Sequence, residues 1–179
     1  MSADEKQADS NTNEEAAEKS SHTREFKGQV KLTGNTFDNY AAGDNVVAKG
    51  QVVFTSPVTT TPKCSITLKG QIVMSEASHQ MLAPAITTLA GQLILYPDGI
   101  VPRLIMGEDM LNQAFLEAMT DREILITFGR LRFASDVQAE TLKEKIHSIA
   151  CIGQITCSES LYPHVMLLCR DKLGEVEIG

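Results

Sequence analysis

The 179-residue sequence has no tryptophan, and only 5% of its residues are aromatic. This composition argues against a surface that binds single-stranded nucleic acid by base stacking. No apolar run approaches the roughly 20 residues of a membrane-spanning helix. The polar, acidic N-terminus lacks the apolar segment of a secretory signal, and four cysteines are too few for a dense disulfide framework. These absences predict a cytoplasmic protein without a membrane span.

The sequence also lacks motifs for chemistry. Cys151 and Cys157 do not have the spacing of a zinc site, and no glycine-rich phosphate loop is present. A net charge of −7 disfavours binding to nucleic acid. We therefore predict no enzyme activity, no cofactor and no metal. The alternative is a carbohydrate-binding protein or enzyme of the β-helix type, for which Asp98, Glu108 and Asp109 form the acidic cluster to test.

Residues 1–23 are rich in Ser, Asn, Glu, Lys and Ala and contain six acidic residues against two lysines. A segment of this kind has too little apolar surface to offset the entropy lost on ordering. We expect a disordered acidic tail at 1–23 and a folded domain at 24–179.

One short phrase recurs through the folded domain. Its copies are FKGQVKL (26–32), AKGQVVF (48–54), LKGQIVM (68–74), LAGQLIL (89–95), TFGRLRF (127–133), CIGQITC (151–157) and KLGEVEI (172–178). The glycines follow one another at 22, 20, 21, 38, 24 and 21 residues. A period of this length is typical of solenoids. The 38-residue gap holds either a degenerate repeat around residues 103–107 or a longer insertion.

The positions two and four after each glycine are apolar in all seven copies. This alternation predicts a strand of about five residues with one buried face. Residues 34–45 and 56–65 favour loops or short strands rather than helices. Helical segments are expected at 108–119, after a capping box at Ser135, and for a turn or two within 77–88 and 158–168. The predicted fold is an α/β solenoid of about seven turns, with one short parallel strand per 20–24-residue repeat in a single sheet. An all-β parallel β-helix is the alternative.

Residues 66–179 resemble bacterial leucine-rich repeats of about 21 residues, in which a strand is followed by Ser-Glu or Ser-Asp and an amphipathic return. The asparagine ladder of that family is replaced here by Gly-Gln. The first three copies look more like a parallel β-helix. The resemblance implies a protein that binds other proteins through its sheet.

The glutamine after each glycine recurs in five copies. In parallel strands paired in register, such side chains lie about 4.8 Å apart and can form a hydrogen-bonded ladder. This column either stabilises the sheet alone or forms a polar recognition strip.

The position three after the glycine carries an apolar stripe in the middle of the chain, which predicts an exposed partner surface unless the tail or a loop covers it. The predicted protein-binding residues are Gln51, Val53, Gln71, Val73, Gln92, Ile94, Arg130 and Arg132. The first copy is rich in lysine and the last in glutamate, and no capping repeat follows. We therefore expect a non-enzymatic protein that binds a protein partner or itself, either head to tail or through the face of its sheet.

Overall fold

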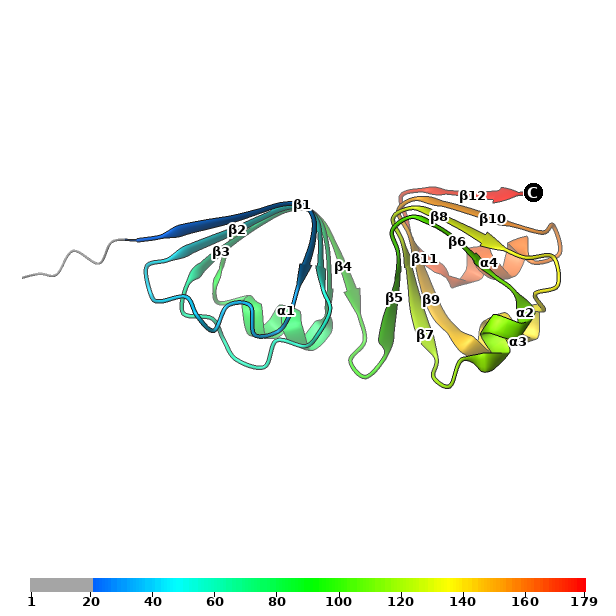
Figure 1. Ribbon diagram of the computed structural model, residues 1–179, viewed down its shortest axis with the longest axis horizontal. Coiled ribbons are helices and arrows are strands. Elements are labelled where there is room, and N and C mark those ends of the chain that lie inside the picture. Colours follow the sequence, from blue (N-terminus) through cyan, green and yellow to red (C-terminus); the bar gives the residue numbers. More distant parts are fainter. Residues whose placement is uncertain (1–20) are drawn as a thin grey trace, which may run out of the picture.

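The computed structural model describes residues 21–179, which consist mostly of parallel β-strands with a few short helices (Figure 1). The strands form three four-stranded sheets. Figure 1 shows two bent stacks of strands side by side, here called the N-terminal half (residues 21–96) and the C-terminal half (residues 97–179). Of the predicted tail, residues 1–20 lie outside the described residues. The first strand begins at Thr23.

The N-terminal half contains four long strands: β1 (Thr23–Leu32), β2 (Asn45–Phe54), β3 (Ser65–Ser75) and β4 (Ile86–Tyr96), with helix α1 (Glu76–Leu82) between the last two. They pair in parallel, in the order β1-β2-β3-β4, with the recurring glycines aligned. Each strand bends sharply into a first arm before the glycine and a second arm after it (Figure 1). The strands have 10 or 11 residues and are therefore about twice as long as predicted.

In the C-terminal half the glycine interrupts each strand. The sheet before the glycines contains β5 (Val101–Ile105), β7 (Glu123–Thr127), β9 (Ile146–Cys151) and β11 (Cys169–Lys172). The sheet after them contains β6 (Glu108–Leu111), β8 (Arg130–Phe133), β10 (Gln154–Cys157) and β12 (Glu175–Ile178). At the corner, the N–H groups of Ile152 and Gly153 both donate to the carbonyl oxygen of Thr127, at 2.8 and 2.7 Å. Because such corners break the ladder, the prediction of a single sheet was wrong.

The 38-residue gap contains two paired strands rather than a long insertion. Strand β5 pairs in parallel with β7, and β6 pairs in parallel with β8. Asp109 aligns with Leu131 in this pairing. The polar residue at a position that is otherwise apolar explains why the sequence pattern left open whether the gap holds a degenerate repeat or a longer insertion.

Three short helices, α2 (Gln113–Ala118), α3 (Ala139–Lys145) and α4 (Tyr162–Leu168), occupy returns of the C-terminal half. The predicted helix at 108–119 was partly wrong, because residues 108–111 pair with β8 as a strand. The predicted capping box at Ser135 was also wrong, since α3 begins after Gln138. The expected absence of helices in 34–45 and 56–65 is confirmed.

Each half has its own apolar core between its arms and its returns. In the N-terminal half this core includes Val52, Phe54, Ile72 and Met74, which alternate along the strands as predicted. In the C-terminal half the core includes Leu131, Ile155 and Cys157 from the strands and Leu116, Leu142 and Val165 from the helices. A third cluster lies between the two halves.

Candidate assembly surfaces

The predicted apolar stripe is not exposed. Val53 and Val73 are 0% exposed and Ile94 is 3% exposed, because the outer face of the second arms packs on the C-terminal half. The opposing side chains include Ile124 and Ile126 of β7. The stripe is covered by the other half of the same fold, so these three residues are not available to a partner.

The sequence contained a signal for this packing that the prediction missed. In the N-terminal half the residue before the glycine is mostly lysine, whereas the residue three after it is mostly aliphatic. In the C-terminal half the pattern is exchanged: Phe128 and Ile152 precede their glycines, whereas Arg132 and Thr156 follow at the third position. Since these positions point away from each core, the exchange marks which outer face each half buries against the other.

The glutamine column forms the predicted ladder over the first three strands. The side-chain amide of Gln29 donates to Gln51 at 3.1 Å, and that of Gln51 donates to Gln71 at 3.3 Å. The ladder stops at β4, where Oε1 of Gln92 has no hydrogen-bond partner. These bonds join neighbouring strands, which agrees with a stabilising role. The same side chains line a shallow groove of about 440 Å³ together with their glycines.

Arg130 and Arg132 lie on the exposed face of the sheet formed by β6, β8, β10 and β12. This face lines an open depression of about 780 Å³. Arg130 pairs with Glu108 at 3.0 Å, and both side chains are largely exposed. Met110, 57% exposed, lies on the same sheet. Of the predicted protein-binding residues, the two arginines are therefore among those that remain accessible.

The acidic cluster considered for a glycan site is not assembled. Asp98 accepts hydrogen bonds from the backbone N–H of Ala77 at the start of α1, at 3.3 and 3.2 Å. Glu108 and Asp109 lie beyond the far end of the five-residue strand β5, which spans about 16 Å. Within residues 21–179, no group of three or more His, Cys, Asp or Glu side chains is arranged to hold a metal ion.

The cysteine thiols are shielded. Cys64, Cys151 and Cys157 are buried, and Cys169 is partly buried. Burial raises the pKa of each of these thiols, and it raises the pKa of Cys169 to about 12. Because the thiolate is the reactive form, these groups are poor nucleophiles near neutral pH.

The last strand of each half leaves core side chains exposed. The position four after the glycine is filled by Leu32, Phe54 and Met74 in β1 to β3, all at most 2% exposed, but Leu95 of β4 is 38% exposed. The C-terminal half repeats this difference, since Leu111 is 1% exposed and Ile178 of β12 is 58% exposed. Leu89 of β4, 41% exposed, also belongs to the core-facing side of its strand. The cores are thus open at β4 and at β12.

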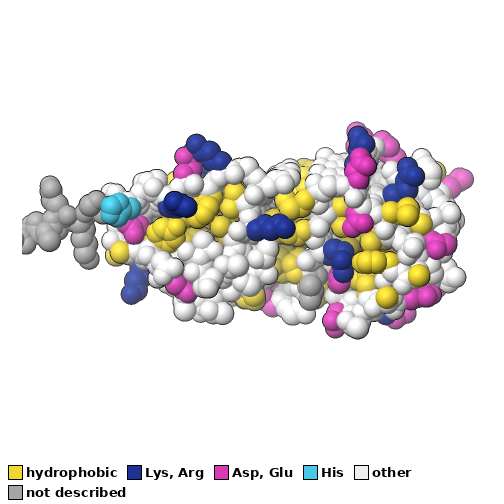
Figure 2. Space-filling view, viewed as in Figure 1, with side chains coloured by type: hydrophobic (Ala, Val, Ile, Leu, Met, Phe, Trp, Pro, Cys, Tyr) yellow, Lys and Arg dark blue, Asp and Glu magenta, His cyan; other side chains and the backbone are white. Residues whose placement is uncertain are grey.

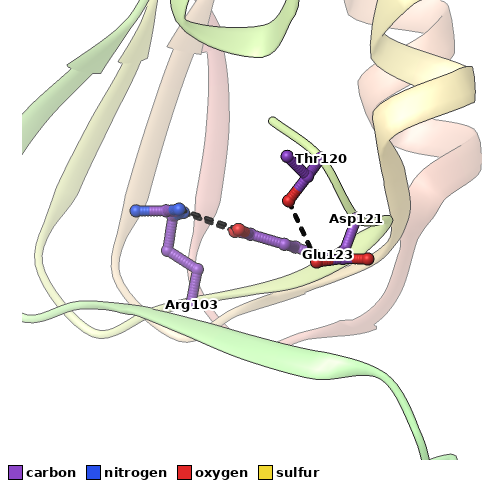
Figure 3. A network of polar contacts seen from close by, with 4 residues as sticks. All are labelled: Arg103, Thr120, Asp121 and Glu123. Carbon is purple, nitrogen blue, oxygen red and sulfur yellow. Dashed lines mark hydrogen bonds and ion pairs between the residues drawn. The ribbon is translucent and has the colours of Figure 1, made fainter. Parts of the chain in front are cut away.

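The opposite end of the C-terminal half is closed by a charged group (Figure 3). Arg103 aligns with the core residue Leu125 and forms two hydrogen bonds with Glu123, at 2.5 and 2.8 Å. Its guanidinium lies 5.0 Å from the centre of the Phe115 ring. Hydrogen bonding to Glu123 raises the pKa of Arg103, so the charged form is favoured. The β5 end therefore presents a polar cover over the core.

Strand β4 also differs from the other edge strands in its lack of charged residues. In the described part of the chain, the edge strands are β1, β4, β5, β6, β11 and β12. All except β4 contain charged residues, and β5 also contains a proline. The sequence of β4, ITTLAGQLILY, contains neither a charge nor a proline. Charged residues and proline are common protections of exposed strand edges, so β4 is the unprotected edge.

The two halves differ in net charge. Residues 21–96 contain six Lys or Arg against four Asp or Glu, and residues 97–179 contain eight against thirteen. In the view of Figure 2 the Asp and Glu side chains gather mainly over the C-terminal half. The first arms of the N-terminal half carry Lys27, Lys49 and Lys69 in one aligned column. Glu25 pairs with the first two at 2.9 and 2.7 Å, and these lysines lower the pKa of its carboxyl.

Comparison with known proteins found no matching family model, no matching curated protein and no matching solved structure. Within residues 21–179, no helix combines the length and the apolar character needed to cross a bilayer. The candidate surfaces are therefore assigned from the exposure, charge and strand edges of this chain alone.

Proposed function

We propose that this chain is a non-enzymatic, self-assembling structural solenoid that associates with other copies of itself through the open ends of its strand stacks. The observation that carries the proposal is the exposure of core-facing side chains at β4 and β12, where Leu95 and Ile178 are 38% and 58% exposed. The equivalent side chains in preceding strands are almost fully buried. An additional strand layer would complete both cores.

The physical driving force is burial of apolar surface together with the pairing of free strand edges. Covering one leucine or isoleucine side chain contributes about 1.5–3 kcal/mol when burial is complete. Unpaired backbone groups on an edge strand are a template for pairing with another chain. The parallel pairing of four strands in each sheet, with the glycines of β1 to β4 aligned, supports a solenoid.

Sedimentation velocity and light scattering over a wide concentration range test this proposal. We expect the wild-type chain to associate reversibly, and we expect Leu95→Asp combined with Ile178→Asp to remain monomeric. Met110→Asp is the matched control, because Met110 is also exposed but faces away from the core, at the opposite end of its sheet from β12. Circular dichroism verifies that each variant is folded. A wild-type chain that stays monomeric at every concentration contradicts the proposal.

A second candidate is binding of a different protein on the exposed face that contains Arg130 and Arg132. The supporting observation is the open depression of about 780 Å³, with Met110 beside the two arginines. Arginine and methionine are enriched in protein interfaces. If this face binds a partner, Arg130→Glu with Arg132→Glu abolishes binding and Leu95→Asp does not.

A further inference from the structure

We infer that β4 pairs in an antiparallel arrangement with β4 of a second copy, about a two-fold axis that places Gly91 opposite Gly91 of the partner copy. The inference rests on the proposed self-assembly and specifies its interface. It predicts a two-fold interface in which the two four-stranded sheets of the N-terminal halves form one continuous sheet.

The first argument is the character of the β4 edge. Strand β4 has 11 residues and is the edge strand of the described chain that carries no charge. Its residues Thr88 to Gly91 are all exposed. Lys27, Lys49 and Lys69 align across β1, β2 and β3, but Ala90 takes their place in β4. The column therefore loses its charge at the strand where a charge would protect the edge.

The second argument is that the bend in β4 is compatible with two-fold symmetry. Strand β4 has five residues on each side of Gly91. A two-fold axis along the bisector of the bend exchanges the two arms, so two bent strands can lie along each other in opposite directions. The axis places Leu89 opposite Leu93 of the partner and Ala90 opposite Gln92. Core-facing residues thus meet core-facing residues, and the 41% exposed Leu89 becomes covered.

The third argument concerns the other edge of the same sheet. A head-to-tail arrangement requires β4 to pair with β1 of the next copy. Strand β1 carries four charged residues, and its core-facing Val30 and Leu32 are already 7% and 2% exposed. Phe37, buried beside Phe54, belongs to the same core. The β1 end therefore offers little uncovered apolar surface, whereas two β4 ends complement each other.

The fourth argument is electrostatic. Exchange of the arms brings the C-terminal half of each copy to the side of the lysine column on the first arms of the other copy. The N-terminal half has an excess of basic residues and the C-terminal half an excess of acidic residues. The two-fold arrangement thus places opposite charges near one another, which favours association at low ionic strength.

The first experiment restores the missing charges. Thr88→Lys with Ala90→Lys is expected to raise the dimer dissociation constant by about tenfold or more, as measured by sedimentation equilibrium. Thr67→Lys is the matched control, because Thr67 aligns with Thr88 but lies on β3, one strand inside the edge. The control is expected to dimerise like the wild type. An unchanged dissociation constant for the double variant, in a chain that does associate, overturns the inference and leaves the proposed self-assembly intact.

Disulfide trapping then tests direction and register. Residues directly opposite each other in antiparallel strands have Cα atoms about 4.5–5.5 Å apart, within the range of a disulfide. The variant Ala90→Cys with Gln92→Cys is therefore expected to form a covalent dimer under mild oxidation, and no larger species. The variant Lys27→Cys with Ala90→Cys is expected to remain uncrosslinked. A ladder of multimers from the second variant instead indicates head-to-tail stacking and overturns the two-fold pairing. The wild-type chain controls for its own shielded cysteines.

Discussion

The two halves of the molecule use the same short phrase to make different corners. In the N-terminal half the strand continues through the bend, and the glycines have φ values of +88° to +118°. In the C-terminal half the strand stops, and two successive N–H groups share one carbonyl oxygen of the preceding layer. The residue before the glycine is lysine in β1, β2 and β3 of the first half, but Phe128 and Ile152 in the second, where that arm is covered.

The difference teaches that the core-facing positions of a repeat and its outward-facing positions are determined by different contacts. The inward positions are apolar in both halves because each half must fill its own core. The outward positions depend on which arm faces the other half. Val73 and Arg132 both occupy the third position after a glycine, yet Val73 is 0% exposed and Arg132 lies at an open surface.

The largest expected effect comes from the corner glycines. Gly70 has φ +114°, and a Cβ atom there would overlap the carbonyl oxygen of Gly50. We expect Gly70→Ala to lower the free energy of unfolding by about 3 kcal/mol or more. At Gly153 φ is not positive, but a Cβ atom would still overlap the carbonyl oxygens of Gly129 and Phe128. Gly153→Ala therefore lacks only the cost of a left-handed backbone, about 1–2 kcal/mol. Urea unfolding measures both. Equal losses would show that the two corners do not differ in strain.

The second expected effect compares Val73 and Arg132, which occupy the same outward position after a glycine in the two halves. Val73→Ala removes buried apolar contacts between the halves and should cost about 2 kcal/mol. Arg132→Ala should change the free energy of unfolding by less than about 0.5 kcal/mol, because its position faces the open depression. Thermal and urea unfolding of the two variants under the same conditions test the comparison. A similar cost for both would contradict the assignment of one covered and one open face.

The smallest expected effect concerns Tyr96, whose hydroxyl donates to the carbonyl oxygen of Phe54 at 3.2 Å within the buried contact region. Tyr96→Phe should cost about 1 kcal/mol near neutral pH. Burial raises the pKa of Tyr96 above its ordinary value of 10.0. The native state therefore favours the neutral phenol, and its contribution is complete below about pH 10 and is lost as the pH rises through the folded-state pKa.

Unfolding curves at pH 8 and at pH 11 measure this loss. The wild type should lose more stability over that interval than Tyr96→Phe, and Tyr40→Phe serves as the matched control. An identical pH dependence in the wild type and in Tyr96→Phe would show that ionisation of Tyr96 does not cause the loss of stability at high pH.

The inward alternation was sufficient to predict the parallel pairing and its register. Position-by-position alignment of Val52 with Ile72, and of Ile72 with Leu93, follows from a two-residue period anchored on one glycine. The pattern could not predict the strand lengths, because residues before the glycine were treated as returns. The pairing of β6 was missed because Asp109 breaks the alternation, and pairing with β8 overrides the helical pattern there.

The candidate site was less predictable than the fold. The surface expected to bind a partner included Val53, Val73 and Ile94, and packing of the two halves removed all three from solvent. Such packing depends on how two separate stacks meet, which the period of one repeat does not specify. The ladder among Gln29, Gln51 and Gln71 was predictable because it depends only on register.

The aligned glycines have a further consequence for sequence change. The returns between copies differ in length, with successive glycines 20 to 24 residues apart in most of the chain, yet the glycines of β1 to β4 come back to the same alignment. Added or deleted residues are thus absorbed in the exposed parts of the returns, while one insertion inside a strand would displace a corner from its neighbours. The tips of loops 33–44 and 55–64 are accordingly the places to graft a foreign peptide for display.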